Sequence, residues 1–151
     1  FVQGSAGLFE QWAESFLPHV NELPPADQAY CQSIGGDPNI YYFHSAWRLA
    51  EDEVLVIEAP EIPECQTWNF QLDNWWMESL DYRHHTIHVN KHTAHYEADG
   101  SVRLVVSHSD PGLPNWIETA GHDMGTMCWR WIGADRHPPV ATRVMKLAEL
   151  Q

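Results

Sequence analysis

The sequence predicts an all-β protein: an antiparallel β-sandwich with jelly-roll character, preceded by one N-terminal helix. Three observations lead to this class. After residue 40, apolar and polar residues alternate with a period of two in most segments, which is the pattern of half-buried strands. Gly, Pro, Asn and Asp separate about seven such segments. No helical pattern recurs between them, so nothing is predicted to cover a parallel sheet.

The first predicted element is the N-terminal helix. Ser5 is a suitable N-cap, and Pro18 ends the helix. Between them the apolar residues recur at the spacing of one helical stripe: Phe9, Trp12, Ala13, Phe16 and Leu17. From Asn21 to Asn39 the chain is rich in Pro, Gly, Asp and Gln, which predicts a connection. We therefore divide the chain into a helix with its connection, 1–39, and a β-sandwich, 40–151, within one compact domain of ordinary size.

The strands follow in order along the second part. They are predicted at 41–48, 53–59, 67–76, 86–97, 102–108, 126–131 and 140–147. The clearest pattern is Thr67–Trp76, where Trp68, Phe70, Leu72 and Trp76 share the face toward the core. The opposite, polar face is then formed by Thr67, Asn69, Gln71, Asp73 and Trp75. Further along, Thr126, Cys128 and Arg130 alternate in the same way with Met127, Trp129 and Trp131.

One turn has a strong local signal. Asp99-Gly100 suits a two-residue type I′ loop, because both central residues of that turn need a positive φ. It predicts a hairpin that joins 92–97 to 102–108. The numbers of paired residues would then sum to 199, so that His95 lies opposite Leu104 and His92 opposite Ser107.

Composition excludes several classes of partner. Lys and Arg number 8 against 21 Asp and Glu, which gives a formal charge of −13. A phosphate backbone or an acidic membrane surface needs a basic face that this chain cannot build, so nucleic acid is not an expected partner. No apolar run approaches the roughly 20 residues that span a bilayer, so membrane insertion is not expected either. The compartment is not readable from the sequence.

The three cysteines, Cys31, Cys65 and Cys128, are widely spaced and odd in number. They predict reduced, mostly buried thiols and neither a disulfide framework nor a thiolate zinc site. The ten histidines concentrate after residue 83. No His-x-His pair occurs there, so a transition-metal site would need His88 or His92 to meet His44 from a third strand. The alternative is a set of hydrogen-bonded or solvated imidazoles, with no cofactor.

A resemblance to a known family begins at Asp110-Pro111-Gly112-Leu113-Pro114-Asn115-Trp116 and continues with Trp129-Arg130. Together with weaker matches over residues 40 to 147, these motifs resemble the C-terminal domain known as domain of unknown function 1214. The resemblance implies a β-sandwich with jelly-roll character and, because members usually carry a longer N-terminal portion, a chain that is part of a larger protein. It implies no activity. His92 departs from the family motif, which often has Gln there.

Three functions follow from these patterns. The first is a binding module for a small neutral polar or aromatic ligand, because amides, a guanidinium and indoles together suit such a molecule. Its residues would be Asn69, Gln71, Trp75, Asn115, Trp116 and Arg130. The second is an acid–base or metal-assisted enzyme on the same face, with Arg130 holding an anion. Its catalytic residues would be His88 or His92 with Asp73 or Asp123. The third is a subunit-assembly domain, a homo-oligomer interface indicated by the eight tryptophans.

Overall fold

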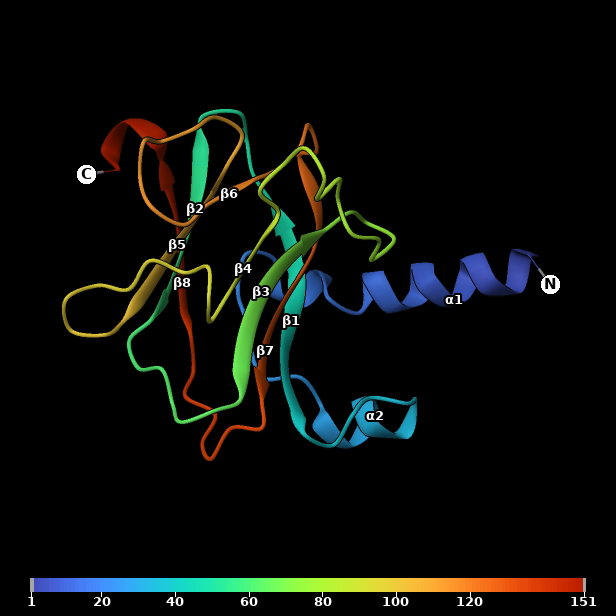
Figure 1. The fold of residues 1–151 in the computed structure, drawn as a ribbon. Coiled ribbons are helices and arrows are strands. Elements are labelled where there is room, and N and C mark those ends of the chain that lie inside the picture. The colour runs from blue at the N-terminus through green and yellow to red at the C-terminus, as the bar shows by residue number, and fades with distance from the viewer. Residues whose placement is uncertain (1, 151) are drawn as a thin grey trace.

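The computed structural model describes residues 2–150, and its strands form two stacked sheets (Figure 1). In sheet A the strand order is β1 (Ile40–Arg48), β7 (Met124–Ile132), β3 (Thr67–Asp73) and β4 (His88–Asn90). In sheet B the order is β6 (Trp116–Glu118), β5 (Val102–Ser107), β2 (Glu53–Ala59) and β8 (Ala141–Lys146). All pairs are antiparallel except β5 with β6. The predicted sandwich of predominantly antiparallel sheets is confirmed. Phe1 and Gln151, the outer ends of the two predicted ranges, lie outside the described residues.

The core lies between the sheets and is unusually rich in tryptophan. Its largest side chains, all fully buried, are Trp47, Trp68, Trp129, Trp131, Phe43 and Phe70 from sheet A, with Leu55, Ile57, Leu104 and Ile117 from sheet B. The predicted alternation holds in β3 and β7. The even-numbered residues of β3 and the odd-numbered residues of β7 face the core, and the residues between them face outward. Half of the tryptophans that suggested an assembly surface are therefore core residues.

The two α-helices lie beside sheet A, on the side away from sheet B (Figure 1). Helix α1 (Val2–Glu14) begins before Ser5, which is therefore not its N-cap, and a 3₁₀ turn, η1 (Leu17–His19), follows it. Only the end of the predicted apolar stripe is covered: Ala13 and Phe16 are buried, whereas Phe9 and Leu17 are 43% and 40% exposed. Neither α1 nor any other helix within residues 2–150 combines the length and the apolar character that crossing a membrane requires.

A second helix, α2 (Gln28–Ser33), corrects the prediction of a connection from 21 to 39. The Asp27 carboxylate caps it by accepting a hydrogen bond of 2.9 Å from the Tyr30 amide. The six residues are too few to show a helical stripe, which explains why their pattern gave no signal. The last helical turn, η2 (Leu147–Glu149), follows β8 directly.

Strand β3 ends at Asp73, three residues earlier than predicted. The Asn74 side chain causes this, because its Oδ1 accepts hydrogen bonds from the amides of Trp76 (2.9 Å) and Glu78 (3.0 Å) and closes a turn. Met77 in that turn has a φ of +59°. Trp76, expected in the core, is 44% exposed.

The predicted hairpin at Asp99-Gly100 is wrong, although the turn itself forms. Gly100 has a φ of +85°, but Asp99 is not among the residues with positive φ, so the turn is not type I′. After it, β5 pairs with β2 and β6 in sheet B, and the segment 92–97 forms no strand. The backbone of His95 is held by Asn115 instead, through bonds of 2.7 and 2.8 Å.

Candidate functional site

The outer face of sheet A carries the polar side chains that alternation predicted. Three strands bring them together in neighbouring rows, set by the antiparallel register of β1, β7 and β3. One row is Tyr42, Arg130 and Asn69; the next is His44, Cys128 and Gln71; the third is Ala46, Thr126 and Asp73. This polar floor therefore combines residues that are up to 88 positions apart in the sequence.

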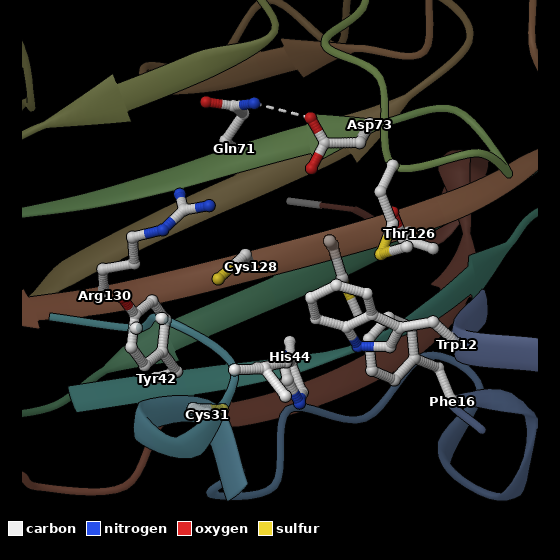
Figure 2. Close-up of a pocket in the computed structure, with 15 residues that line it drawn as sticks. Trp12, Phe16, Cys31, Tyr42, His44, Gln71, Asp73, Thr126, Cys128 and Arg130 are labelled. Carbon is white, nitrogen blue, oxygen red and sulfur yellow. Dashed lines mark hydrogen bonds between the residues drawn. The ribbon is translucent and has the colours of Figure 1, made fainter. Parts of the chain in front are cut away.

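A pocket of about 350 Å³ lies over this floor. Its walls are aromatic and aliphatic: Trp12 comes from α1 and Phe16 follows that helix, Cys31 and Ile34 come from α2 and its C-cap, and Met77 comes from the turn after β3. In Figure 2, Arg130 and Asp73 lie at opposite ends of the floor, with Cys128 and Gln71 between them. A polar floor under an apolar wall is the usual make-up of a small-molecule site.

Asp73 is buried at one end of the pocket. Its Oδ1 accepts a hydrogen bond of 2.5 Å from the Gln71 amide (Figure 2). Its backbone oxygen accepts a bond of 3.1 Å from the Trp47 indole, which fixes the end of β3. Burial raises the pKa of the Asp73 carboxyl, and the bond from Gln71 and the charge of Arg130 oppose this shift only in part. The carboxyl is thus held where its charged form is disfavoured.

Arg130 supplies the positive charge at the other end. Its Nη1 donates a hydrogen bond of 3.0 Å to Asn69 Oδ1, so the two predicted ligand residues position each other. The carboxylates of residues 2–150 form no ion pair with Arg130. By contrast, Arg83, Arg103, Arg136 and Arg143 each have a carboxylate partner.

His44 completes the floor from β1. Its ring packs against Phe16, with centroids 4.5 Å apart and planes tilted by 45°. Burial and, to a smaller extent, the nearby charge of Arg130 lower the pKa of the imidazole to about 4. At neutral pH the ring is therefore uncharged and offers one donor and one acceptor.

This pKa predicts a pH dependence of stability. Between about 4 and the ordinary value of 6.5, the unfolded chain binds more protons at His44 than the folded chain does. The folded state therefore loses stability as pH falls from 6.5 toward 4, by about 2 to 3 kcal/mol for this group. Asp73 acts in the opposite sense, because a raised carboxyl pKa favours the folded state at low pH, an advantage lost as pH rises through that pKa.

Urea unfolding between pH 4 and 8 tests the prediction with His44→Gln. The variant should lose less stability than the wild type on acidification from pH 6.5 to 4. His88→Gln is the matched control, since His88 is exposed on β4, and it should follow the wild type. Parallel profiles for His44→Gln and the wild type would contradict a buried, neutral His44.

Cys128 lies at the centre of the floor, where burial disfavours its thiolate form. Burial raises its pKa to about 12, which the charge of Arg130 only partly opposes, so the reactive thiolate is scarce at neutral pH. Cys31 and Cys65 are also buried, burial raises their thiol pKa values, and none of the three is in a disulfide. The three thiols are buried, as the sequence predicts.

Four predicted ligand residues do not line this pocket, and Asn69, which bonds Arg130 from β3, is one of them. Trp75 lies in the turn after β3 and not on the extended strand. Asn115, with a φ of +56°, links two loops: its side chain bonds both backbone groups of His95 and donates to the Arg103 oxygen at 2.9 Å. Trp116 donates its indole hydrogen to the Ser107 oxygen at 3.3 Å. The described contacts of Asn115 and Trp116 are thus structural.

The predicted catalytic and metal residues also separate. His88 lies opposite Gln71 on the edge strand, and His44 is at the far side of the same row, three strand spacings or about 14 Å away. His92 and Asp123 are exposed in loops. Within residues 2–150, no three His, Cys, Asp or Glu side chains gather as a metal site would require. Of the predicted catalytic set, the pocket contains Asp73 and Arg130.

The walls of the pocket are the part that sequence reasoning missed. The sequence predicts Trp12 and Phe16 on the apolar stripe of a helix, and Cys31 and Ile34 in a connection. It predicts no ligand-binding role for either pair. The apolar stripe is itself a signal for this wall. A helix that precedes a single sandwich can bury its apolar stripe against the outer face of a sheet. The sequence indicates His44 only as a third metal ligand, whereas it is a neutral member of the floor.

The solved structures to which the chain is similar include two proteins. One is an uncharacterized protein from Burkholderia cenocepacia, with 61% sequence identity and a TM-score of 0.92 over 95% of this chain and 40% of that chain. The other is the VPA0106 protein from Vibrio parahaemolyticus, with 15% identity and a TM-score of 0.57 over 76% of this chain and 33% of that chain. This second likeness shows the fold alone. The chain therefore spans less than half the length of either protein.

Other comparisons give no match: no family model and no curated protein is similar to the chain. The geometry of the pocket is therefore the basis for any statement about function.

Proposed function

We propose that this domain binds a small organic ligand with an aromatic or flat apolar body in the pocket on the outer face of sheet A. The observation that supports this most directly is the pairing of a polar floor with an aromatic wall in one pocket. Arg130, Gln71, Asp73 and His44 offer hydrogen bonds of different kinds, while Trp12 and its neighbours offer apolar contact. Such a combination fixes the orientation of a ligand through the floor and gains affinity through the wall.

A pair of tryptophan variants tests this proposal. Trp12→Ala removes an aromatic wall from a helix in which Ala13 alone is buried, so the core between the sheets is untouched. Trp76→Ala is the matched control, because Trp76 is 44% exposed and lies outside the pocket. A library of small aromatic compounds with hydroxyl, amide or carboxyl groups would be screened by ligand-observed NMR. Compounds that bind the wild type should no longer bind the Trp12→Ala variant and should still bind the Trp76→Ala variant. Equal binding to both variants would refute the proposal.

Proton-transfer catalysis is a second candidate, favoured by one observation. The pocket holds an imidazole that is neutral at pH 7 and a carboxyl whose pKa is raised, at His44 and Asp73. A neutral imidazole can accept a proton, and a carboxyl with a raised pKa can return one. If a bound compound is converted, His44→Gln should abolish conversion while binding persists. Recovery of every bound compound unchanged would leave binding alone as the function.

We also propose membership in the family of domain of unknown function 1214 and a role within a longer protein. The motif from Asp110 to Trp116 and the β-sandwich support the first. The coverage of the Burkholderia cenocepacia protein, of which this chain spans 40%, supports the second. If members of that family lack a counterpart of the Asn115 bridge between two loops, the membership is wrong.

A further inference from the structure

The most informative charge in the pocket is that of Arg130. In a chain with a formal charge of −13, carboxylates are abundant, and four of the other arginines pair with one. Arg130 instead contacts a neutral amide, that of Asn69, through one of its nitrogens. A guanidinium has five N–H donors arranged as a fork, and this fork matches a carboxylate that bonds through both oxygens.

The surroundings of Arg130 keep its charge available to a ligand. The neighbouring floor residues are a neutral imidazole, a neutral thiol and an amide, at His44, Cys128 and Gln71. Asp73 lies four residues farther along the floor, about 13 Å between strand positions, and its carboxyl is influenced by the charge of Arg130 but forms no ion pair with it. That carboxyl is buried and already accepts a bond from Gln71. The near end of the pocket is thus positive and the far end polar.

From this arrangement we infer that the ligand is a small aromatic carboxylic acid, bound with its carboxylate on Arg130, its ring against Trp12 and Phe16, and a hydroxyl group toward Asp73. The inference rests on the proposed function and adds the charge and orientation of the ligand. A hydroxyl suits the far end because it both donates and accepts, and so fits Asp73 in either protonation state. This replaces the neutral ligand predicted from the sequence with an anionic one.

The test uses two probes of nearly the same size and shape, one anionic and one neutral: 4-hydroxyphenylacetate and its amide, 4-hydroxyphenylacetamide. Titration calorimetry and ligand-observed NMR would measure both against the 151-residue chain. We expect the acid to bind about 10- to 100-fold more tightly than the amide, the range for a charge-assisted contact. Arg130→Gln, which retains a side-chain amide that can bond Asn69, should reduce acid binding by about the same factor and weaken amide binding clearly less. Arg130→Lys keeps the charge but not the fork of donors, so its affinity for the acid should lie between those of the wild type and Arg130→Gln.

Arg83→Gln is the matched control, because Arg83 is exposed and pairs with Asp81 outside the pocket. It should leave both probes unaffected, and thermal melting would verify that each variant folds. If acid and amide bind equally and both are lost with Trp12→Ala, the inference is overturned while the proposed function stands. If neither probe binds but other library compounds depend on Trp12, the inference is likewise overturned and the proposed function stands. If no compound depends on Trp12, the inference and the proposed function fall together.

Discussion

Replacing Trp129 with Ala is expected to lower the free energy of unfolding by about 4 kcal/mol, the range for deleting a large buried aromatic side chain. Trp129 is fully buried at the centre of the core. Its ring stacks on Trp68 with centroids 4.7 Å apart and planes within 2°, and it meets the edge of Trp131 at 5.1 Å. Removing it leaves a cavity between the sheets that its stiff neighbours cannot fill.

Urea unfolding followed by circular dichroism measures this loss. Trp129→Phe should cost clearly less, because the indole nitrogen of Trp129 has no hydrogen-bond partner to lose. Trp76→Ala, at an exposed site, should stay within about 0.5 kcal/mol of the wild type. A Trp129→Ala variant as stable as Trp76→Ala would mean that the tryptophan cluster does not hold the two sheets together.

Gly125→Ala is expected to lower the free energy of unfolding by about 3 kcal/mol, at the upper end for overpacking. The reason is steric, since φ at Gly125 is not in the left-handed region. An added Cβ would lie 2.1 Å from the Asp73 backbone oxygen and 2.8 Å from Trp47 Nε1. Those two atoms form the hydrogen bond that fixes the end of β3, so the substitution must also displace the Asp73 end of the pocket.

Gly7→Ala provides the matched control. An alanine Cβ at Gly7 meets nothing within 4 Å, and alanine favours a helix over glycine by about 0.5 to 1 kcal/mol. The two substitutions add the same methyl group and should shift the urea midpoint in opposite directions. Binding of 4-hydroxyphenylacetate should weaken with Gly125→Ala and persist with Gly7→Ala. Equal stability of the two variants would contradict the close packing of β3 on β7.

The polar floor could be predicted from the sequence because a strand's period of two assigns each residue to a face whatever its partner strand is. Asn69, Gln71 and Asp73 follow from one segment, and Cys128 and Arg130 from another. Strand order has no comparable local signal. Nothing in the sequence near Thr126 indicates that β7 lies between β1 and β3. The placement of Arg130 and His44 in neighbouring rows of one floor therefore could not be predicted.

Local turn chemistry is a weaker guide than alternation. The Asp99-Gly100 turn forms, but a tight turn fixes only its own four residues. The sheet that β5 joins is decided by the burial of Val102, Leu104 and Val106 between the two sheets. Likewise, the abundance of His suggests a shared metal site, whereas no three His, Cys, Asp or Glu side chains of residues 2–150 gather as metal ligands. His108, for instance, bonds Thr119 Oγ1 at 2.8 Å and the Leu49 oxygen at 3.2 Å.

The central claim, that the outer face of sheet A is the floor of a ligand pocket, is tested most directly by mapping a bound probe onto side-chain resonances. Two-dimensional ¹H–¹⁵N NMR of the chain during titration with 4-hydroxyphenylacetate would follow the Arg130 Nε–H, the Gln71 amide and the Trp12 indole. A ligand in this pocket should shift these three signals together with one saturation curve while the Trp116 indole stays fixed. Shifts at Trp116 with no change at Arg130, Gln71 and Trp12 would contradict the claim.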